Sequence, residues 1–299
     1  MNFRGILFFP VTPFSTSGDV DTELLAQHVA NGLAHAAGGV FPACGTGEFH
    51  ALSVAEHAAV VRTTVDTVGG AVPVIAGSGG PLGHAIDVAR QAADAGADGL
   101  LVMPPYLVGA PQEGLVTYIE AVAAASDLAV IVYHRANAQF TAASMRRLAE
   151  NPKVVGFKDG AGDIGAAQLI VRAVADAGRD DFAFFNGLLT AELTQAAYRA
   201  MGIPLYSSST FAMAPDVANA YYRAYIDGDD ERRLRLLDGF YAPLVALRDE
   251  TPGFGVSLVK TGLRISGVPV GSVRPPLVDP TPEQERRLAA ILDAGRALV

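Results

Sequence analysis

The 299-residue sequence is poor in cysteine and has no long apolar segment. With Cys44 as the single cysteine, no disulfide can form within the chain, which fits a reducing cytoplasm. No stretch of about 18 or more unbroken apolar residues occurs, so we expect no membrane span. The first ten residues, MNFRGILFFP, lack the features of a signal peptide and are typical of a first strand. A net charge of -9 and a pI near 5.1 disfavour nucleic acid and anionic membranes as partners, although a small acidic substrate is still compatible.

Several common motifs are also missing. No H-x-x-x-H or C-x-x-C spacing exists, so we expect no metal site. No G-x-S-x-G elbow is present. The segment GAGDIG (160–165) matches a dinucleotide-binding fingerprint, but no acidic residue ends a second strand about 20 residues later. We therefore expect neither a metal nor a nucleotide cofactor.

Lysine is scarce as well: of 22 basic residues, three are lysine, namely Lys153, Lys158 and Lys260. Lys158 follows VVGF, a run typical of a buried strand. Arginine cannot lose its proton in a protein, whereas a buried lysine can and then becomes an amine nucleophile. Lys158 is therefore a candidate for Schiff-base chemistry with a carbonyl substrate. The alternative is a lysine that extends to solvent or pairs with Asp159 or Asp163.

Short apolar runs alternate with longer alanine-rich helical runs along most of the chain. Near-continuous hydrophobicity is typical of strands buried on both faces, as in a parallel sheet. The expected strands span 5–10, 38–43, 72–77, 98–104, 128–134, 154–159, 182–187 and 203–208. The expected helices span 21–36, 53–68, 81–95, 112–125, 141–150, 164–178, 188–200 and 215–226. Eight such units predict an α/β fold, a (β/α)₈ TIM barrel over 1–226, with a C-terminal helical extension over 227–299 packed on it. A doubly wound open sheet is the main alternative.

In such a barrel the chemistry lies at the C-terminal ends of the strands. These ends carry ACGTGEFH (43–50), MPPYL (103–107), YHRAN (133–137), KDGAGD (158–163) and SSST (207–210). Tyr133 is a candidate general acid/base, or else it caps the barrel core. The turn GTGE (45–48) offers backbone N–H groups that suit a carboxylate, or else it is a plain glycine-rich connector.

Taken together, these segments resemble the dihydrodipicolinate synthase / N-acetylneuraminate lyase family over nearly the whole chain. The early TPF motif of that family corresponds to Thr12, Pro13 and Phe14. Its carboxylate-binding G-[ST]-[ST]-G-E motif corresponds to Cys44, Gly45, Thr46, Gly47 and Glu48. Its strand-5 tyrosine corresponds to Tyr133, its Schiff-base lysine to Lys158, and the end of the lysine motif to Asp163. Tyr106 corresponds to the tyrosine that, in the synthases, reaches in from a neighbouring subunit.

The departures from the synthase pattern point to one branch of the family. Gly45 replaces the first hydroxyl of the turn, and Arg135 follows the tyrosine at two residues. The segments CGTGEF, YHRAN and GFKDGAGD most resemble the 5-dehydro-4-deoxyglucarate dehydratases, which convert a C6 keto-diacid to 2,5-dioxopentanoate, water and carbon dioxide. The alternatives are an aldolase or 4-hydroxy-tetrahydrodipicolinate synthase of the same family, and a keto-acid-binding barrel without activity.

The resemblance implies a set of roles. Lys158 would form the imine, with Tyr133, Thr46 and Tyr106 as candidate proton-transfer groups. The carboxylate beside the ketone would bind at Gly45, Thr46 and Gly47. The distal end of the substrate would meet Arg135, Asn137, Ser207, Ser208 or Ser209. No metal or organic cofactor is implied, and a homo-oligomer, a tetramer built as a dimer of dimers, is expected.

Overall fold

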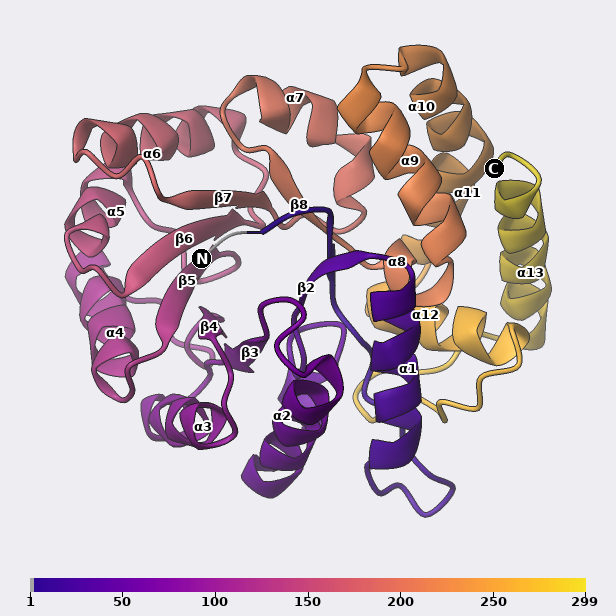
Figure 1. Ribbon diagram of the computed structural model, residues 1–299, viewed down its shortest axis with the longest axis horizontal. Helices are drawn as coiled ribbons and strands as arrows, with labels where there is room; N and C mark the ends of the chain where they lie inside the picture. Colours follow the sequence, from indigo (N-terminus) through magenta and orange to yellow (C-terminus); the bar gives the residue numbers. More distant parts are fainter. Residues whose placement is uncertain (1–2) are drawn as a thin grey trace.

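The computed structural model describes residues 3–299 and contains a barrel of eight parallel strands inside a ring of helices (Figure 1). Every expected strand is present, each shorter than or as long as expected. The strands are β1 (Ile6–Phe8), β2 (Ala37–Val40), β3 (Ile75–Ser78), β4 (Gly99–Val102), β5 (Ala129–His134), β6 (Val154–Asp159), β7 (Ala183–Asn186) and β8 (Leu205–Ser208). Their order is β2-β1-β8-β7-β6-β5-β4-β3.

The barrel closes between β2 and β3, the two strands at the ends of that order. A parallel bridge joins Val40 to Val74, and the Val40 amide donates to the Pro73 carbonyl at 2.9 Å. This closure excludes the doubly wound open sheet, because an open sheet leaves both end strands unpaired. The TIM barrel is therefore confirmed.

The helices follow the strands as expected, with one exception. They are α1 (Thr22–Ala34), α2 (Val54–Val68), α3 (Leu82–Asp94), α4 (Gln112–Ala124), α5 (Ala142–Ala149), α6 (Ile164–Asp176), α7 (Gln195–Ala200) and α9 (Pro215–Asp227). The expected helix 188–200 is split into a 3₁₀ turn, η2 (Ala191–Leu193), and the short α7. Thr190 has a left-handed backbone (φ 53°) that an α-helix does not accept. A further short helix, α8 (Thr210–Met213), precedes α9.

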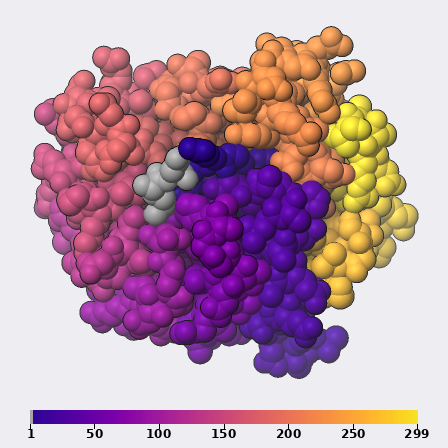
Figure 2. Space-filling model, in the orientation of Figure 1, coloured from indigo at the N-terminus to yellow at the C-terminus, as the bar shows by residue number. Residues whose placement is uncertain are grey.

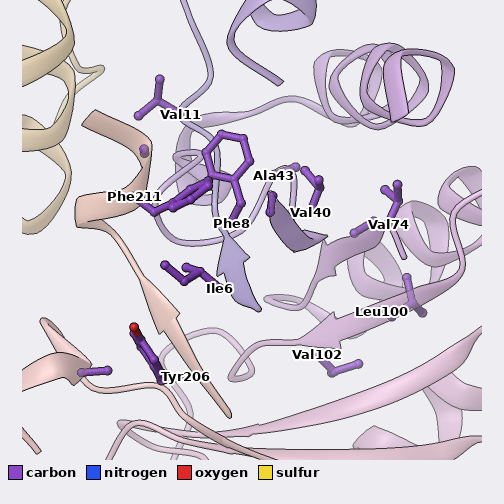
Figure 3. Close-up of a cluster of buried hydrophobic side chains, with 14 of the residues drawn as sticks. Ile6, Phe8, Val11, Val40, Ala43, Val74, Leu100, Val102, Tyr206 and Phe211 are labelled. Carbon is purple, nitrogen blue, oxygen red and sulfur yellow. The ribbon is translucent and has the colours of Figure 1, made fainter. Parts of the chain in front are cut away.

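The alternation of side chains along each strand separates two cores. On β1, Ile6 and Phe8 face the helices, whereas Leu7 faces the barrel interior. The outer core is shown in Figure 3, where Phe8 packs against Phe211 of α8 with ring centroids 5.3 Å apart. The inner core is filled by side chains up to the level of Tyr133, so the barrel interior is packed rather than open.

The C-terminal part of the chain is helical. It comprises α10 (Asp230–Leu236), the π-helical turn η3 (Leu237–Tyr241), α11 (Ala242–Arg248), α12 (Phe254–Ile265) and α13 (Pro282–Arg296). Helix α12 contacts α8, and α13 contacts α9. In Figure 2 the yellow end of this part borders both an orange surface and the indigo N-terminal part. A division into two domains at 226/227 stays a prediction. Within residues 3–299, no helix is long and apolar enough to cross a membrane.

Candidate active site

A cavity of about 430 Å³ opens at the C-terminal ends of the strands. It brings together seven of the residues expected from the sequence, namely Gly45, Thr46, Tyr133, Arg135, Lys158, Ser207 and Ser209. The rest of its lining comprises Phe9, His50, Leu101, Met103, Pro104, Ala136, Gly187, Leu188, Leu189, Thr190, Gly253, Gly255, Val256 and Leu277. The last four belong to the C-terminal part, so the helical extension helps to form the cavity.

Lys158 projects into the barrel because of its place in β6. Phe157 and Asp159, the residues on either side of it, face outward by alternation. Asp159 accepts a hydrogen bond from the Tyr198 hydroxyl at 2.5 Å. Asp163 caps α6 by accepting from the Ala166 amide. The alternative in which Lys158 pairs with one of these carboxylates is therefore wrong.

The Lys158 side chain is 6% exposed and lies among aromatic rings. Its Nζ lies 4.2 Å from the ring centroid of Tyr133 and 4.4 Å from that of Phe9. In the part of the chain that the structure describes, no carboxylate lies within ion-pair distance of this amine. A buried amine held by π faces and not by a carboxylate keeps its lone pair accessible once it loses a proton.

Two glycines make room for this arrangement. A Cβ on Gly187 would lie 2.6 Å from Cγ of Lys158 and 2.7 Å from its Cε. A Cβ on Gly160 would lie 2.7 Å from the Tyr133 ring. Both distances are far below van der Waals contact, so any side chain at these positions would displace the lysine or the tyrosine.

Tyr133 is paired with Lys158 in the β5–β6 register and interacts with Arg135. Its hydroxyl donates to the Gly187 carbonyl at 3.1 Å and accepts from Nη1 of Arg135 at 2.9 Å. Burial alone would raise the pKa of Tyr133, but the nearby Lys158 and Arg135 cations outweigh burial and lower this pKa below its ordinary value of 10. A tyrosine with a lowered pKa is better suited to accept a proton near neutral pH.

The turn after β2 lines the cavity through Gly45 and Thr46. Inside the turn, the Glu48 amide donates to Gly45 and the Phe49 amide donates to Cys44, both at 3.1 Å. Thr12 also holds the turn, because its hydroxyl donates to the Gly47 carbonyl at 2.7 Å. Among residues 3–299, no acceptor takes the amides of Thr46 and Gly47. These two N–H groups are therefore available to a carboxylate.

Gly45 and Cys44 have different surroundings. A Cβ on Gly45 would meet nothing within 4 Å, so the missing hydroxyl of the family motif leaves open space in the cavity. Cys44 is fully buried behind the turn, and burial raises the pKa of its thiol to about 12. The thiol is therefore uncharged at neutral pH and is no nucleophile.

Four expected site residues do not line this cavity, namely Gly47, Tyr106, Asn137 and Ser208. The Asn137 amide donates to the carbonyls of Pro105 and Val108 and so holds the loop after β4. Ser208 faces away from the barrel interior and donates to Oε1 of Glu192 at 2.5 Å. Tyr106 is 63% exposed on the loop after β4. Contact of Asn137 or Ser208 with the distal end of a substrate is not supported, because both side chains already have internal partners.

Sequence reasoning missed Phe9, His50 and Thr190. His50 lies two residues after the GTGE turn, and this proximity was the signal available for it. Phe9 follows β1 directly, so it lies at the C-terminal end of a strand, and Tyr133 lies near the C-terminal end of β5. Thr190 had no comparable signal. Its hydroxyl accepts from Nη1 of Arg248 at 2.7 Å, a contact between segments 58 residues apart.

The other two lysines have structural partners. Nζ of Lys153 donates to the carbonyls of Ala123 and Ser126, at the end of α4, and to Asp127. Nζ of Lys260 forms a fully buried ion pair with Glu48 at 2.7 Å. Each lysine in this chain therefore has a distinct environment, and Lys158 is the one that lines the cavity.

Comparisons with known proteins agree with this geometry. Residues 2–295 match the dihydrodipicolinate synthetase family. The chain is 51% identical over 296 residues to the probable 5-dehydro-4-deoxyglucarate dehydratase 1 of Streptomyces coelicolor, covering 99% of this chain and 94% of that protein. It is 42% identical over 289 residues to the probable 5-dehydro-4-deoxyglucarate dehydratase of Azotobacter vinelandii, covering 96% and 94%. The crystal structure of dihydrodipicolinate synthase from Oceanobacillus iheyensis superposes with a TM-score of 0.90 at 26% identity, covering 99% and 97%. A chain matched over its full length in both sequence and fold, with a buried lysine at the end of the sixth strand, belongs to the dihydrodipicolinate synthetase family.

Proposed function

We propose that this chain is a Schiff-base lyase that converts 5-dehydro-4-deoxy-D-glucarate to 2,5-dioxopentanoate, water and carbon dioxide. The observation that carries the proposal is the placement of Lys158 and Tyr133 side by side in the cavity, in a chain about half identical to dehydratases of that name. Arg135 adds a cation to the same cavity, as a substrate with two carboxylates requires.

The first step is formation of an imine on Lys158. The neutral amine attacks the substrate ketone, and loss of water gives the C=N bond. The carboxylate beside the ketone binds the free amides of Thr46 and Gly47, which fixes the carbonyl carbon near Nζ. Tyr133 carries the proton in this step, because its ring centroid lies 4.2 Å from Nζ of Lys158.

The second step is elimination of water. Once protonated, the imine withdraws electrons, so the adjacent CH₂ becomes acidic. Tyr133, as its phenolate, removes a proton from that carbon, and the electron pair forms a C=C bond as the β-hydroxyl leaves. The departing hydroxide takes up a proton and leaves as water, with Tyr133 or Thr46 as the candidate donor. The product of this step is an imine conjugated with the new double bond.

The third step is loss of the distal carboxylate as carbon dioxide. The conjugated imine accepts the electron pair of the broken C–C bond through the double bond, giving a dienamine. The carbon that lost the carboxylate keeps its hydroxyl, so this end of the dienamine is an enol. Protonation on carbon, tautomerisation of the enol to the aldehyde and hydrolysis of the imine then release 2,5-dioxopentanoate and free Lys158. The lysine supplies the electron sink, so the proposal requires no metal or organic cofactor.

The distal carboxylate is assigned to Arg135, with Ser207 and Ser209 as neighbouring hydroxyls. Arg135 uses one guanidinium N–H for Tyr133, and the described residues provide no carboxylate partner for the others. The remaining donors are therefore available for a substrate carboxylate, as bidentate recognition requires.

The decisive experiment is incubation with 5-dehydro-4-deoxyglucarate, following carbon dioxide and product mass. Borohydride added during turnover should reduce the imine and leave an adduct on the peptide that contains Lys158. An adduct on Lys153 or Lys260 would refute the assignment. Turnover that requires a second carbonyl substrate and releases no carbon dioxide would favour the alternative, an aldolase or synthase of this family.

The assembly and location of the chain are part of the same proposal. Tyr106, Leu107 and Val108 form an exposed apolar tip, with exposures of 63%, 81% and 63%. Large exposed apolar groups in one place mark an interaction surface. We assign this tip to an interface in a homotetramer arranged as a dimer of dimers, in which Tyr106 enters the cavity of the neighbouring subunit. A cytoplasmic location is the further expectation.

A further inference from the structure

Glu48, the last residue of the GTGE turn, combines two unfavourable features. Its backbone is left-handed (φ 57°), a conformation in which a side chain is strained. Its carboxylate is completely buried, as is the Lys260 side chain that pairs with it. Burial removes the hydration of both charges, so a buried ion pair persists only when its geometry and remaining hydrogen bonds are good.

The carboxylate of Glu48 is held at both oxygens. Oε1 accepts from Nζ of Lys260 at 2.7 Å, and Oε2 accepts from the Arg274 amide at 2.7 Å. Lys260 also donates to the Ser272 carbonyl at 2.9 Å, so a second N–H of its ammonium group is satisfied in the same region. All these partners belong to the C-terminal part, 212 or more positions along the chain from Glu48.

The left-handed corner at Glu48 determines where the turn directs its amides. The Glu48 amide closes the turn on Gly45 at 3.1 Å. This closure leaves the amides of Thr46 and Gly47 without an internal acceptor among the described residues. If the corner relaxed to an ordinary conformation, these amides would change direction, because the direction of an N–H group follows the backbone dihedral angles.

We propose that Glu48 is a positioning residue, whose carboxylate, anchored by Lys260 and Arg274, holds the turn in the shape that receives the carboxylate beside the substrate ketone. The C-terminal extension then contributes to substrate binding, because it supplies both residues that anchor the Glu48 carboxylate. The inference rests on the proposed Schiff-base chemistry, but it applies to any 2-keto acid that forms an imine on Lys158.

The competing explanation is that the ion pair only joins the extension to the barrel. The two explanations differ in what a weakened pair changes. A purely structural pair affects thermal stability and leaves keto-acid binding intact in the protein that stays folded. A positioning pair weakens keto-acid binding beyond what the loss of stability explains.

The variants are chosen to separate these effects. Glu48→Asp keeps the charge but shortens the reach to both anchors by one methylene. Glu48→Gln combined with Lys260→Met removes both buried charges at nearly constant volume, and leaves the Arg274 amide as the remaining anchor. The matched control is Asp279→Asn, which breaks the Arg264–Asp279 pair (2.9 Å) within the same C-terminal part without touching the turn.

The assay is the concentration of pyruvate, and of 5-dehydro-4-deoxyglucarate, that gives half-maximal borohydride trapping on Lys158, measured beside Tm. We expect Glu48→Asp and the double variant to raise both half-maximal concentrations at least about tenfold, equal to about 1.4 kcal/mol of binding. Maximal trapping at saturation should change much less, because Lys158 itself is untouched. The control should stay within twofold, and the Tm of the double variant should exceed that of Lys260→Met, in which Glu48 is left unpaired.

Two outcomes would overturn the proposal, and a third would overturn the proposed function on which it rests. Half-maximal concentrations within twofold of the wild type in both Glu48 variants would overturn the positioning role, whatever happens to Tm. An equal rise in the Asp279→Asn control would also overturn it, since the effect would then follow stability alone. Absence of trapping in the wild-type protein is a different result, because it refutes the proposed Schiff-base function and not the anchoring of the turn in particular.

Discussion

Replacement of Arg135 by methionine tests the distal-carboxylate assignment most sharply. In the wild type, the Arg135 guanidinium donates to the Tyr133 hydroxyl at 2.9 Å, and Arg135 lines the cavity. Methionine removes the guanidinium and keeps an apolar side chain of similar length. A hydrogen bond to a charged group contributes about 1.5–3 kcal/mol. Its loss should therefore raise KM for the diacid roughly 10- to 150-fold, at about 1.4 kcal/mol per tenfold change. kcat should fall less than kcat/KM, since the distal charge disappears during decarboxylation.

Arg135 also acts on Tyr133, and this effect has its own signature. Arg135 and Lys158 lower the pKa of Tyr133 against the opposing effect of burial. Tyr133 must be deprotonated to act as the base, so activity declines as pH falls below its pKa. Without Arg135 this pKa rises, and the acid limb of the pH–rate profile should move to higher pH. The displacement should be the same for every substrate, because it belongs to the enzyme.

The assay compares kcat/KM for 5-dehydro-4-deoxyglucarate and for the mono-acid 2-keto-3-deoxygluconate across pH. Only the diacid offers a second carboxylate, so the ratio of the two losses isolates that contact from the effect on Tyr133. Arg146→Met is the matched control, because Arg146 is exposed on α5 and remote from the cavity lining. Equal losses on both substrates would show that Arg135 does not bind the second carboxylate. An unmoved acid limb would show that it does not tune Tyr133.

Four further expectations follow from the same geometry. Tyr133→Phe should keep the fold and lower kcat about 10²–10⁴-fold; activity within a few-fold of the wild type would make Tyr133 a core residue. Gly187→Ala should abolish trapping on Lys158 while circular dichroism stays native, because a Cβ there would lie 2.6 Å from Cγ of the lysine; normal trapping would disprove the packing argument. Burial raises the pKa of Glu192 from 4.5 to about 7, so the free energy of unfolding should fall as pH rises between those values. Urea titrations should show that part of the decline vanish in Glu192→Gln, and an identical decline in the variant would contradict it. EDTA should leave turnover intact, and inactivation reversed by added metal would overturn the cofactor-free mechanism.

Much of the fold follows from the sequence because its strands are buried on both faces. A run such as VVGFKD has few polar residues to obscure its boundaries, and the eight repeats specify a closed barrel. Lys158 was identifiable for a related reason. In a chain that uses arginine for most positive charges, a lysine after an apolar strand requires a chemical explanation.

The misplaced and missed residues lie where strand periodicity ends. Ser207, Ser208 and Ser209 are adjacent and identical, so composition cannot show that the middle one faces Glu192. Side chains alternate along β8, but this alternation identifies the outward serine only when the facing of one of the three is already known. Asn137 and Thr190 lie in loops next to or at left-handed residues, Ala136 (φ 50°) and Thr190 (φ 53°). Such backbone angles redirect the chain in a way that neither a strand nor a helix pattern encodes.

The charge distribution around the cavity favours binding of the substrate over binding of the product. The chain carries a net charge of -9, yet its cavity lining contains Lys158 and Arg135 and no aspartate or glutamate. A cavity of opposite sign to the rest of the surface concentrates an anionic substrate locally. A diacid engages both the turn amides and Arg135, whereas 2,5-dioxopentanoate has lost the carboxylate that Arg135 is proposed to bind. The product therefore forfeits one charged contact at the step that forms it, which favours its release over that of the substrate.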